Sequence, residues 1–310
     1  MEALRATRDR GHPRLIRYLC TFEKSNAYYI LLPWANGSTL NSFWEIFGPE
    51  TLPRSRDLIR ESLDQLLQLT DALNCLHDLN FRHGDLKPDN ILHFTDASGK
   101  LDNFVIADLG IARFHRLNIN LRKAATLTKS TTATYEAPEV RGPASRVPLP
   151  RRYDVWSMGC IMLEDTIWLL WDSEAINAFA EHREYPAFAF FDVQREPDKT
   201  GEKPSVVHSA VLTCMEELRA DPRCRRNTAL RDLIDLIENH MLVVNTERRC
   251  DAKYLHDEVA KIVAKALGPG QGMGDEYVLP SGAHAPATRQ SIFQSKLARV
   301  GTGQSGPRQS

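Results

Sequence analysis

The chain has 310 residues, and its 39 lysine and arginine residues are balanced by 40 acidic residues, which gives a formal net charge of -1. A chain without net positive charge has no global field that would draw it to nucleic acid or to an anionic membrane surface, so no nucleic-acid partner is expected. With 42% hydrophobic and 25% charged residues, the composition is that of a globular protein with a sizeable core, which excludes disorder throughout.

The sequence indicates neither a membrane span nor a disulfide framework. The longest apolar run, residues 155–171, is interrupted by Ser157, Glu164 and Asp165 and is shorter than the roughly 20 apolar residues of a spanning helix. The first residues contain no apolar stretch typical of a secretory signal. The six cysteines are scattered without Cys-x-x-Cys spacing. These features favour a reduced intracellular protein, cytoplasmic or nuclear.

Hydrophobic periodicity predicts a few strands early in the chain and helices afterwards. Residues 14–20 and 27–34 are rich in Ile, Leu and Tyr, and the turn-forming residues 23–26 between them predict an antiparallel hairpin. Leucines at helical spacing make residues 56–77 the clearest helix, and short strands and loops are predicted within 79–112. Further helices are predicted at 153–171, 205–219, 228–243 and 251–266.

The last stretch, residues 268–310, is predicted to be a disordered tail, because it is rich in glycine and has little periodicity. Its Gly-Pro-Gly-Gln-Gly-Met-Gly sequence does not match the G-x-G-x-x-G pattern. It also follows a predicted helix, whereas a phosphate-binding loop follows a strand, so the linker interpretation is favoured over a nucleotide site.

The segment with the clearest chemical meaning is residues 83–92, His-Gly-Asp-Leu-Lys-Pro-Asp-Asn-Ile-Leu. Asp85, Lys87 and Asn90 bring a carboxylate, an ammonium group and an amide into one loop that Pro88 stiffens. This set suits phosphoryl transfer, in which the carboxylate accepts or orients a hydroxyl, the ammonium group neutralises phosphate charge, and the amide binds a metal. Taken alone, the same pattern is also compatible with a solvated loop.

Three further segments follow this loop in a telling order. Residues 106–110 (IADLG) place the carboxylate of Asp108 at a predicted strand end, residues 132–139 have the sequence TATYEAPE, and residues 154–160 have the sequence DVWSMGC. In this order and spacing the four segments resemble the protein kinase superfamily, over about residues 4–266. The resemblance implies an α+β, protein-kinase-like bilobal fold.

The resemblance also implies roles for individual residues. Asp85 would be the catalytic base and Lys87 the phosphate-neutralising group, while Asn90 and Asp108 would bind magnesium beside ATP. Leu32 falls at the position that limits access to the back of the nucleotide site, and Pro33 and Ala35 fall at the hinge that contacts adenine. The implied nucleotide-binding positions are Leu32, Pro33, Ala35 and Leu92.

Other positions are matched as parts of the activation segment or of the framework. Thr132 resembles a residue that bonds the catalytic Asp and Lys, and Glu139 would pair with Arg249 of the NTERRCDA sequence. The implied structural residues are His83, Leu109, Asp154 and Arg249. Because Lys87 follows the Asp-x-Lys-Pro-x-Asn pattern of kinases that act on serine or threonine, the expected partner is a protein substrate with a Ser or Thr hydroxyl.

Two departures from the family pattern stand out. Gly84 replaces the Arg that normally reads a phosphate on the activation loop, which indicates either loss of phosphorylation control or compensation by Arg113 or Arg122. In addition, no glycine-rich loop and no strand lysine precede the hinge, since the only lysine before residue 80 is Lys24. The chain is therefore expected to start inside a helix of the smaller lobe, with Leu4 in the hydrophobic spine together with Tyr18, His83 and Leu109.

The expected organisation is a residual smaller lobe and hinge over residues 1–35, a complete larger lobe over 36–267 and a tail over 268–310. The first functional hypothesis is a Ser/Thr protein kinase. The alternatives are a non-catalytic kinase-like interaction module, with a partner that covers the truncated smaller lobe, or a fragment of a longer active kinase.

Overall fold

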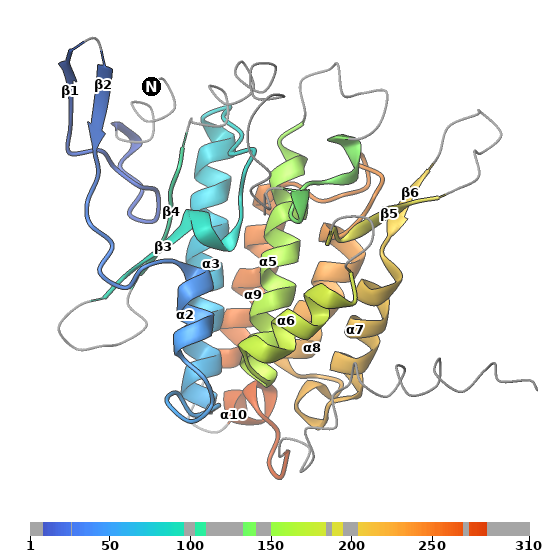
Figure 1. Cartoon of the computed structure of the whole chain (residues 1–310). Coiled ribbons are helices and arrows are strands. Elements are labelled where there is room, and N and C mark those ends of the chain that lie inside the picture. Colours follow the sequence, from blue (N-terminus) through green and yellow to red (C-terminus); the bar gives the residue numbers. More distant parts are fainter. Residues whose placement is uncertain are drawn as a thin grey trace, which may run out of the picture.

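The computed structural model describes residues 9–25, 27–95, 103–109, 133–140, 150–183, 188–194, 204–268 and 273–283. These residues form a mixed α+β protein, a body of helices with three two-stranded sheets (Figure 1). The helices are α2 (Leu40–Ile46), α3 (Arg56–Asp78), α5 (Arg152–Leu170), α6 (Ser173–Glu181), α7 (Ser209–Ala220), α8 (Ala229–Leu236), α9 (Ala252–Leu267) and α10 (Met273–Val278). The strands are β1 (Cys20–Lys24), β2 (Ala27–Leu31), β3 (Ile91–Phe94), β4 (Asn103–Ile106), β5 (Phe191–Val193) and β6 (Ser205–Val207).

Helix α5 forms the centre of the helical body, and its prediction from the apolar run is confirmed. Every residue from Tyr153 to Leu170 is buried, because a helix that is apolar nearly all round needs neighbours on every side. Figure 1 shows α3, α6, α8 and α9 around it. In the described part of the chain, no helix is long and apolar enough to cross a membrane.

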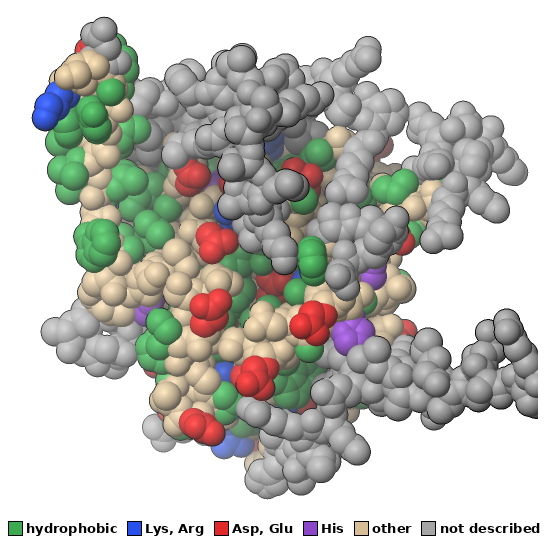
Figure 2. All heavy atoms as spheres, viewed as in Figure 1, with side chains coloured by type: hydrophobic (Ala, Val, Ile, Leu, Met, Phe, Trp, Pro, Cys, Tyr) green, Lys and Arg blue, Asp and Glu red, His purple; other side chains and the backbone are tan. Residues whose placement is uncertain are grey.

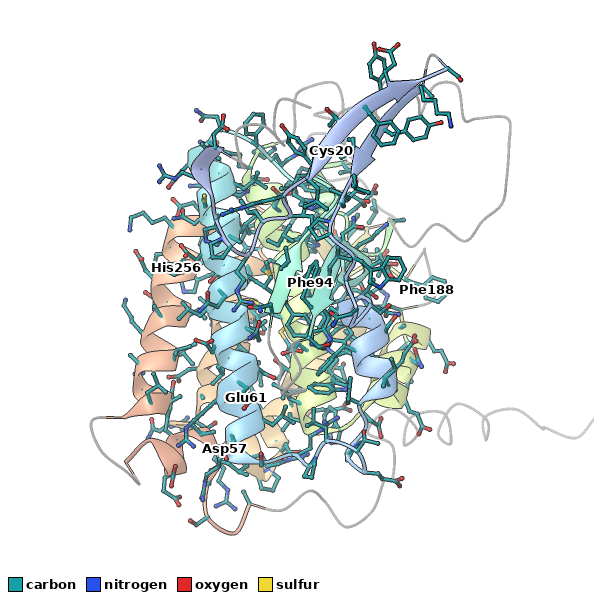
Figure 3. The ribbon with its side chains drawn as sticks, turned by 90° about the vertical axis from the view of Figure 1, so that its left-hand side faces the viewer. Cys20, Asp57, Glu61, Phe94, Phe188 and His256 are labelled. Atoms are coloured by element: carbon teal, nitrogen blue, oxygen red, sulfur yellow. The ribbon has the colours of Figure 1, made fainter. Side chains whose placement is uncertain are left out.

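Helices α3 and α9 pack along each other, and both were predicted from helical patterns in the sequence. Each begins at a side-chain cap: Ser55 accepts a hydrogen bond from the Leu58 amide, and Asp251 accepts one from the Tyr254 amide. Figure 3 shows the two helices side by side, with Glu61 on α3 and His256 on α9. Helix α9 also packs against α5.

The predicted hairpin is present, but its first strand is displaced along the chain. β1 pairs with β2 between Cys20 and Leu31 at one end and Lys24 and Ala27 at the other. The expectation of a strand over residues 14–20 is wrong, because Ile16 lies in the core, where its amide donates to the Ile106 carbonyl at 2.9 Å. Apolar spacing alone could not show that this segment pairs with β4, which is distant in sequence.

The β1–β2 hairpin projects from the helical body and is exposed along both strands. Figure 2 shows its hydrophobic side chains gathered at one corner of the molecule, and Figure 3 shows Cys20 at its base. Phe22 and Tyr29 stack on one face, with ring centroids 5.0 Å apart, while Tyr28 and Trp34 are 82% and 87% exposed. The hairpin therefore presents an apolar surface that the described residues do not cover.

Two short elements depart from the predicted helices. Residues 205–207 form β6 and pair with β5 instead of opening a helix, and α7 starts only at Ser209, where the His208 side chain caps it by accepting from the Ala210 amide. The helices α2 and α6 were not predicted, because segments of 7 and 9 residues carry too few turns for a clear period.

The expected disordered tail from residue 268 onwards is wrong for residues 273–283, which contain helix α10. Arg56 and Arg60 of α3 hold this segment: Arg56 donates to the Leu279 carbonyl at 2.9 Å, and Arg60 bonds the Asp275 carboxylate. Val278 is fully buried. The helix is too short to be stable alone, so its order comes from these long-range contacts. Residues 284–310 lie outside the described residues.

Candidate active site

Asp154, near the start of α5, holds the loop that carries Asp85 through hydrogen bonds. Its fully buried carboxylate accepts hydrogen bonds from the His83 and Gly84 amides, both at 2.8 Å, and lies 2.9 Å from Nε2 of His77. A carboxylate only accepts, so His77 carries its proton on Nε2. Three donors from two elements thereby hold one end of the loop in place.

Gly84 has a backbone reason to be glycine. Its φ angle is +80°, a region that glycine enters at little cost and other residues enter under strain. The sequence indicated that glycine replaces the usual arginine here because phosphorylation control is lost. The positive φ angle gives a second reason for glycine at this position, and this reason does not involve regulation. Arg113 and Arg122, the compensating residues considered from the sequence, lie outside the described residues.

Asp85, Lys87 and Asn90 come together as their spacing predicts. Nζ of Lys87 lies 3.3 Å from Oδ2 of Asp85. Nδ2 of Asn90 donates to the Asp85 carbonyl at 2.7 Å and lies 3.3 Å from its carboxylate. Pro88 begins a single 3-10 turn, Pro88–Asn90, that turns the chain back toward Asp85. The loop therefore concentrates a carboxylate, an ammonium group and an amide around one point.

The β3–β4 sheet brings Asp108 to the same region. Ile91 pairs with Ile106, and the Ala107 amide donates to the Asn90 carbonyl at 2.8 Å, so Asp108 and Asn90 lie at one end of the sheet. Nε2 of His83 bonds the Ala107 carbonyl at 2.7 Å and links this end to the loop.

The donor set at this end fits a magnesium ion. The amide nitrogen of Asn90 is engaged by Asp85, which leaves its side-chain oxygen as the atom for a ligand. An amide oxygen and the Asp108 carboxylate are hard oxygen donors of the type that magnesium prefers. These two residues could therefore hold a magnesium ion.

The positions expected to contact adenine lie in the connection between β2 and α2. Leu32, Pro33 and Ala35 belong to this connection, and Leu32 is exposed. Further along, Thr39 forms an isolated bridge with Leu92 of β3. The structure thus brings Leu92 to the connection that carries the other three positions.

Residues 133–140 are held at their far end by an ion pair. Arg249 donates to both carboxylate oxygens of Glu139, at 2.8 and 3.0 Å, as the resemblance implied. It also donates to the carbonyls of Val243 and Arg152, so its buried guanidinium is well satisfied. Thr132, expected to bond the catalytic Asp and Lys, lies outside the described residues.

The near end of this segment is held by residues that the sequence did not single out. The Ser157 hydroxyl donates to the Tyr135 carbonyl at 2.8 Å, and the Tyr135 hydroxyl donates to Glu164 at 2.7 Å. Burial, reinforced by the negative charge of Glu164, raises the pKa of Tyr135 well above its usual value. The one available signal was Glu164 itself, a charge within the longest apolar run of the chain.

The expected spine residues have mixed outcomes. His83 and Leu109 are buried, and Tyr18 packs against the core from a partly buried position. Leu4 lies outside the described residues. The Asp154 carboxylate accepts a hydrogen bond from the His83 amide.

Comparison with known proteins points to one family. A family model described as "Protein kinase domain" matches residues 1–258. The chain is 31% identical over 159 residues to a probable serine/threonine-protein kinase, fhkD, of Dictyostelium discoideum. The aligned region covers 49% of this chain and 20% of that protein. It is 33% identical over 157 residues to the calcium/calmodulin-dependent protein kinase cmkA of Emericella nidulans, covering 49% of this chain and 33% of that protein. The chain thus spans less than half the length of these relatives.

Proposed function

We propose a function from one premise: the chain belongs to the protein kinase family, whose domain covers residues 1–258. The proposed activity is transfer of the ATP γ-phosphate to a serine or threonine hydroxyl of a protein substrate. The observation that carries it is the contact set of Asp85, Lys87 and Asn90, with Lys87 3.3 Å from Asp85. The similarity to serine/threonine kinases supports the same substrate class.

Each polar residue of the loop has a proposed role. Asp85 accepts the proton of the substrate hydroxyl, and Lys87 offsets the charge of the transferred phosphate. Asn90 and Asp108 would hold magnesium, which neutralises phosphate charge when bound. Glu139 and Thr132 are proposed to act indirectly, by holding the activation segment beside this loop. His83, Leu109, Asp154 and Arg249 are proposed to keep the framework in register.

The nucleotide is proposed to lie between the hairpin connection and β3. Leu32, Pro33 and Ala35 would line the adenine from one side and Leu92 from the other. The bridge between Thr39 and Leu92, which joins the two sides, supports this arrangement. Proline lacks a backbone N–H but keeps its carbonyl, and the carbonyl is the group of Pro33 that would accept a hydrogen bond from adenine.

A second function, that of a non-catalytic interaction module, is favoured by the hairpin. We propose that residues 1–35 belong to the smaller, nucleotide-covering lobe and residues 36–267 to the larger lobe of an intracellular kinase. Tyr28 and Trp34, at 82% and 87% exposure, belong to an apolar surface on which further protein would pack. That protein is either more of the same polypeptide or a separate partner, and without it the nucleotide would be held weakly.

Phosphoryl transfer by the purified 310-residue chain tests the proposal. The chain is incubated with magnesium and γ-labelled ATP and a Ser/Thr-containing protein such as casein, and labelled product is counted. The proposed kinase predicts transfer that is lost in Asp85→Asn and kept in Asp89→Asn, a charge-matched change on the exposed neighbour in the same loop.

Two outcomes count against the catalytic proposal. Equal labelling by the wild type and Asp85→Asn would remove Asp85 from the reaction. If the wild type transfers no phosphate, and a thermal-shift series shows no stabilisation by magnesium-ATP, the interaction-module function takes precedence.

A further inference from the structure

A buried polar cluster joins α5, α6 and the segment that contains Tyr135. Glu164 of α5 accepts a hydrogen bond from the Tyr135 hydroxyl at 2.7 Å and one from Nη2 of Arg183 at 3.0 Å. Arg183, just beyond the end of α6, is 0% exposed. Its guanidinium lies over the rings of Phe179 and Phe190, 4.0 and 3.8 Å from their centroids. Each carboxylate oxygen of Glu164 thus has its own donor.

The cluster is not expected to add much to the free energy of unfolding. Burial raises the pKa of Glu164, an effect that the charge of Arg183 opposes. Nη1 of Arg183 is buried and has no hydrogen-bond partner in the part of the chain that the structure describes. Buried ion pairs often stabilise a fold no better than apolar side chains of similar volume, because their desolvation offsets their attraction. What such a pair does supply is a defined position for its third member, Tyr135.

Tyr135 lies where its position matters for the Asp85 loop. The start of α5 holds both segments: Asp154 accepts hydrogen bonds from the His83 and Gly84 amides, and Ser157, three residues further along, donates to the Tyr135 carbonyl. Tyr135 and the Asp85 loop are therefore fixed to neighbouring turns of one helix. A shift of Tyr135 would displace the chain that borders the polar site.

The segment 133–140 consequently has two anchors. Glu139 is held by Arg249, and Tyr135 is held by Ser157 and by Glu164. The first anchor was expected from the sequence. The second depends on Arg183, which is brought to Glu164 by the turn that ends α6.

We propose that Arg183 is a positioning residue for phosphoryl transfer: through Glu164 it fixes Tyr135 and so sets where the protein substrate meets the Asp85 loop. The inference rests on the proposed kinase function. Arg183 itself is buried and touches no substrate. Its loss should therefore weaken productive binding of the protein substrate much more than binding of the nucleotide.

The test compares Arg183→Met and Arg183→Lys with the wild type and a matched control. Arg219→Met is the control, because Arg219 also pairs with two carboxylates, Asp235 and Glu238, but outside this cluster. Hydrogen exchange measured on the full chain gives a readout that needs no activity. In Arg183→Met, the amides of residues 133–140 should exchange roughly tenfold faster, while those of α3 and α9 stay protected.

The kinetic readout separates positioning from general weakening. In Arg183→Met the KM for a peptide substrate should rise roughly tenfold while the KM for ATP changes less than about twofold, and Arg183→Lys should recover part of the loss. Arg219→Met should leave both constants and the exchange of residues 133–140 unchanged. If Arg183→Met does not fold, Tyr135→Phe, which removes only the hydroxyl donor to Glu164, replaces it with the same expectations.

The outcomes distinguish this inference from the proposed function. If the wild type transfers no phosphate, the proposed function fails, and the exchange measurement alone decides whether Arg183 holds residues 133–140. If transfer occurs but both KM values and local exchange are unchanged in Arg183→Met, the inference is overturned. A uniform rise in exchange without a difference between the two KM values would also overturn it, since that pattern is a purely structural loss.

Discussion

Arg249 donates two parallel hydrogen bonds to Glu139, at 2.8 and 3.0 Å, and so ties the segment before α5 to the segment before α9. The Arg249 side chain is fully buried, and that of Glu139 is nearly so. Bidentate geometry and low exposure make this the pair whose disruption should cost most, because removal of one partner leaves the other as a buried, uncompensated charge.

We expect Glu139→Ala and Arg249→Ala each to lower the free energy of unfolding by about 3–5 kcal/mol. The double variant should lose much less than the sum, since it leaves no stranded charge. Chemical denaturation of the four proteins measures this coupling. The exposed pair of Lys253 and Asp257 provides the control cycle, in which little coupling is expected. Additive losses at Glu139 and Arg249 would contradict the pairing.

A second prediction concerns Gly84, whose φ is +80°. In Gly84→Ala the added Cβ has to enter the left-handed region, so the free energy of unfolding should fall by about 1–2 kcal/mol. Gly48→Ala is the matched control, because a Cβ at that position would meet nothing within 4 Å. Denaturant titration of both variants compares them. An equally small effect at both glycines would mean that the loop adapts without strain.

The sequence predicted those parts of the fold that repeat within one segment. Helices α3 and α9 are long enough for their apolar period to stand out, and α5 is a long, nearly continuous apolar run. All three were located within one or two residues of their bounds. The loop of Asp85, Lys87 and Asn90 was also accessible, because its members lie within six residues of each other.

What escaped prediction depends on partners far away in the chain. The Ile16 amide bonds the Ile106 carbonyl, and Arg56 and Arg60 hold α10, so neither contact could be inferred from neighbouring residues. The buried polar cluster of Tyr135, Glu164 and Arg183 likewise joins segments that are far apart in the sequence. Non-local hydrogen bonds of this kind leave no period or spacing in the sequence.

A third prediction concerns thiol reactivity. Cys20, on the projecting hairpin, is exposed, whereas the other five cysteines are buried. Burial also raises the pKa of those five thiols, so little reactive thiolate forms at neutral pH. A maleimide should therefore label one thiol per chain quickly and the rest only in denaturant. Mass spectrometry counts the labels, and Cys20→Ser should abolish the fast one. Rapid labelling of several thiols would show that the helical body opens readily.

The last prediction concerns Asp165, a carboxylate buried within α5. Its Oδ1 accepts a hydrogen bond from Trp44 Nε1 at 3.0 Å, and burial raises its pKa to about 6 despite that bond and the nearby charge of Arg54. The folded-state pKa lies above the unfolded value of about 4, so the folded protein holds this proton more tightly. Protonated Asp165 therefore adds to the free energy of unfolding below about pH 4, and this contribution is lost as the pH rises to about 6.

Asp165→Asn keeps an oxygen acceptor for Trp44 but cannot ionise. Relative to the wild type, it should therefore gain free energy of unfolding as the pH rises from 4 to 6, by up to about 3 kcal/mol, and then remain constant. Denaturation at pH 4.5, 5.5 and 7.5 measures the difference. Asp257→Asn serves as the control, because its Lys253 partner lowers the pKa of Asp257 and moves its titration below this range. A constant difference between Asp165→Asn and the wild type across the three pH values would show that Asp165 does not titrate here.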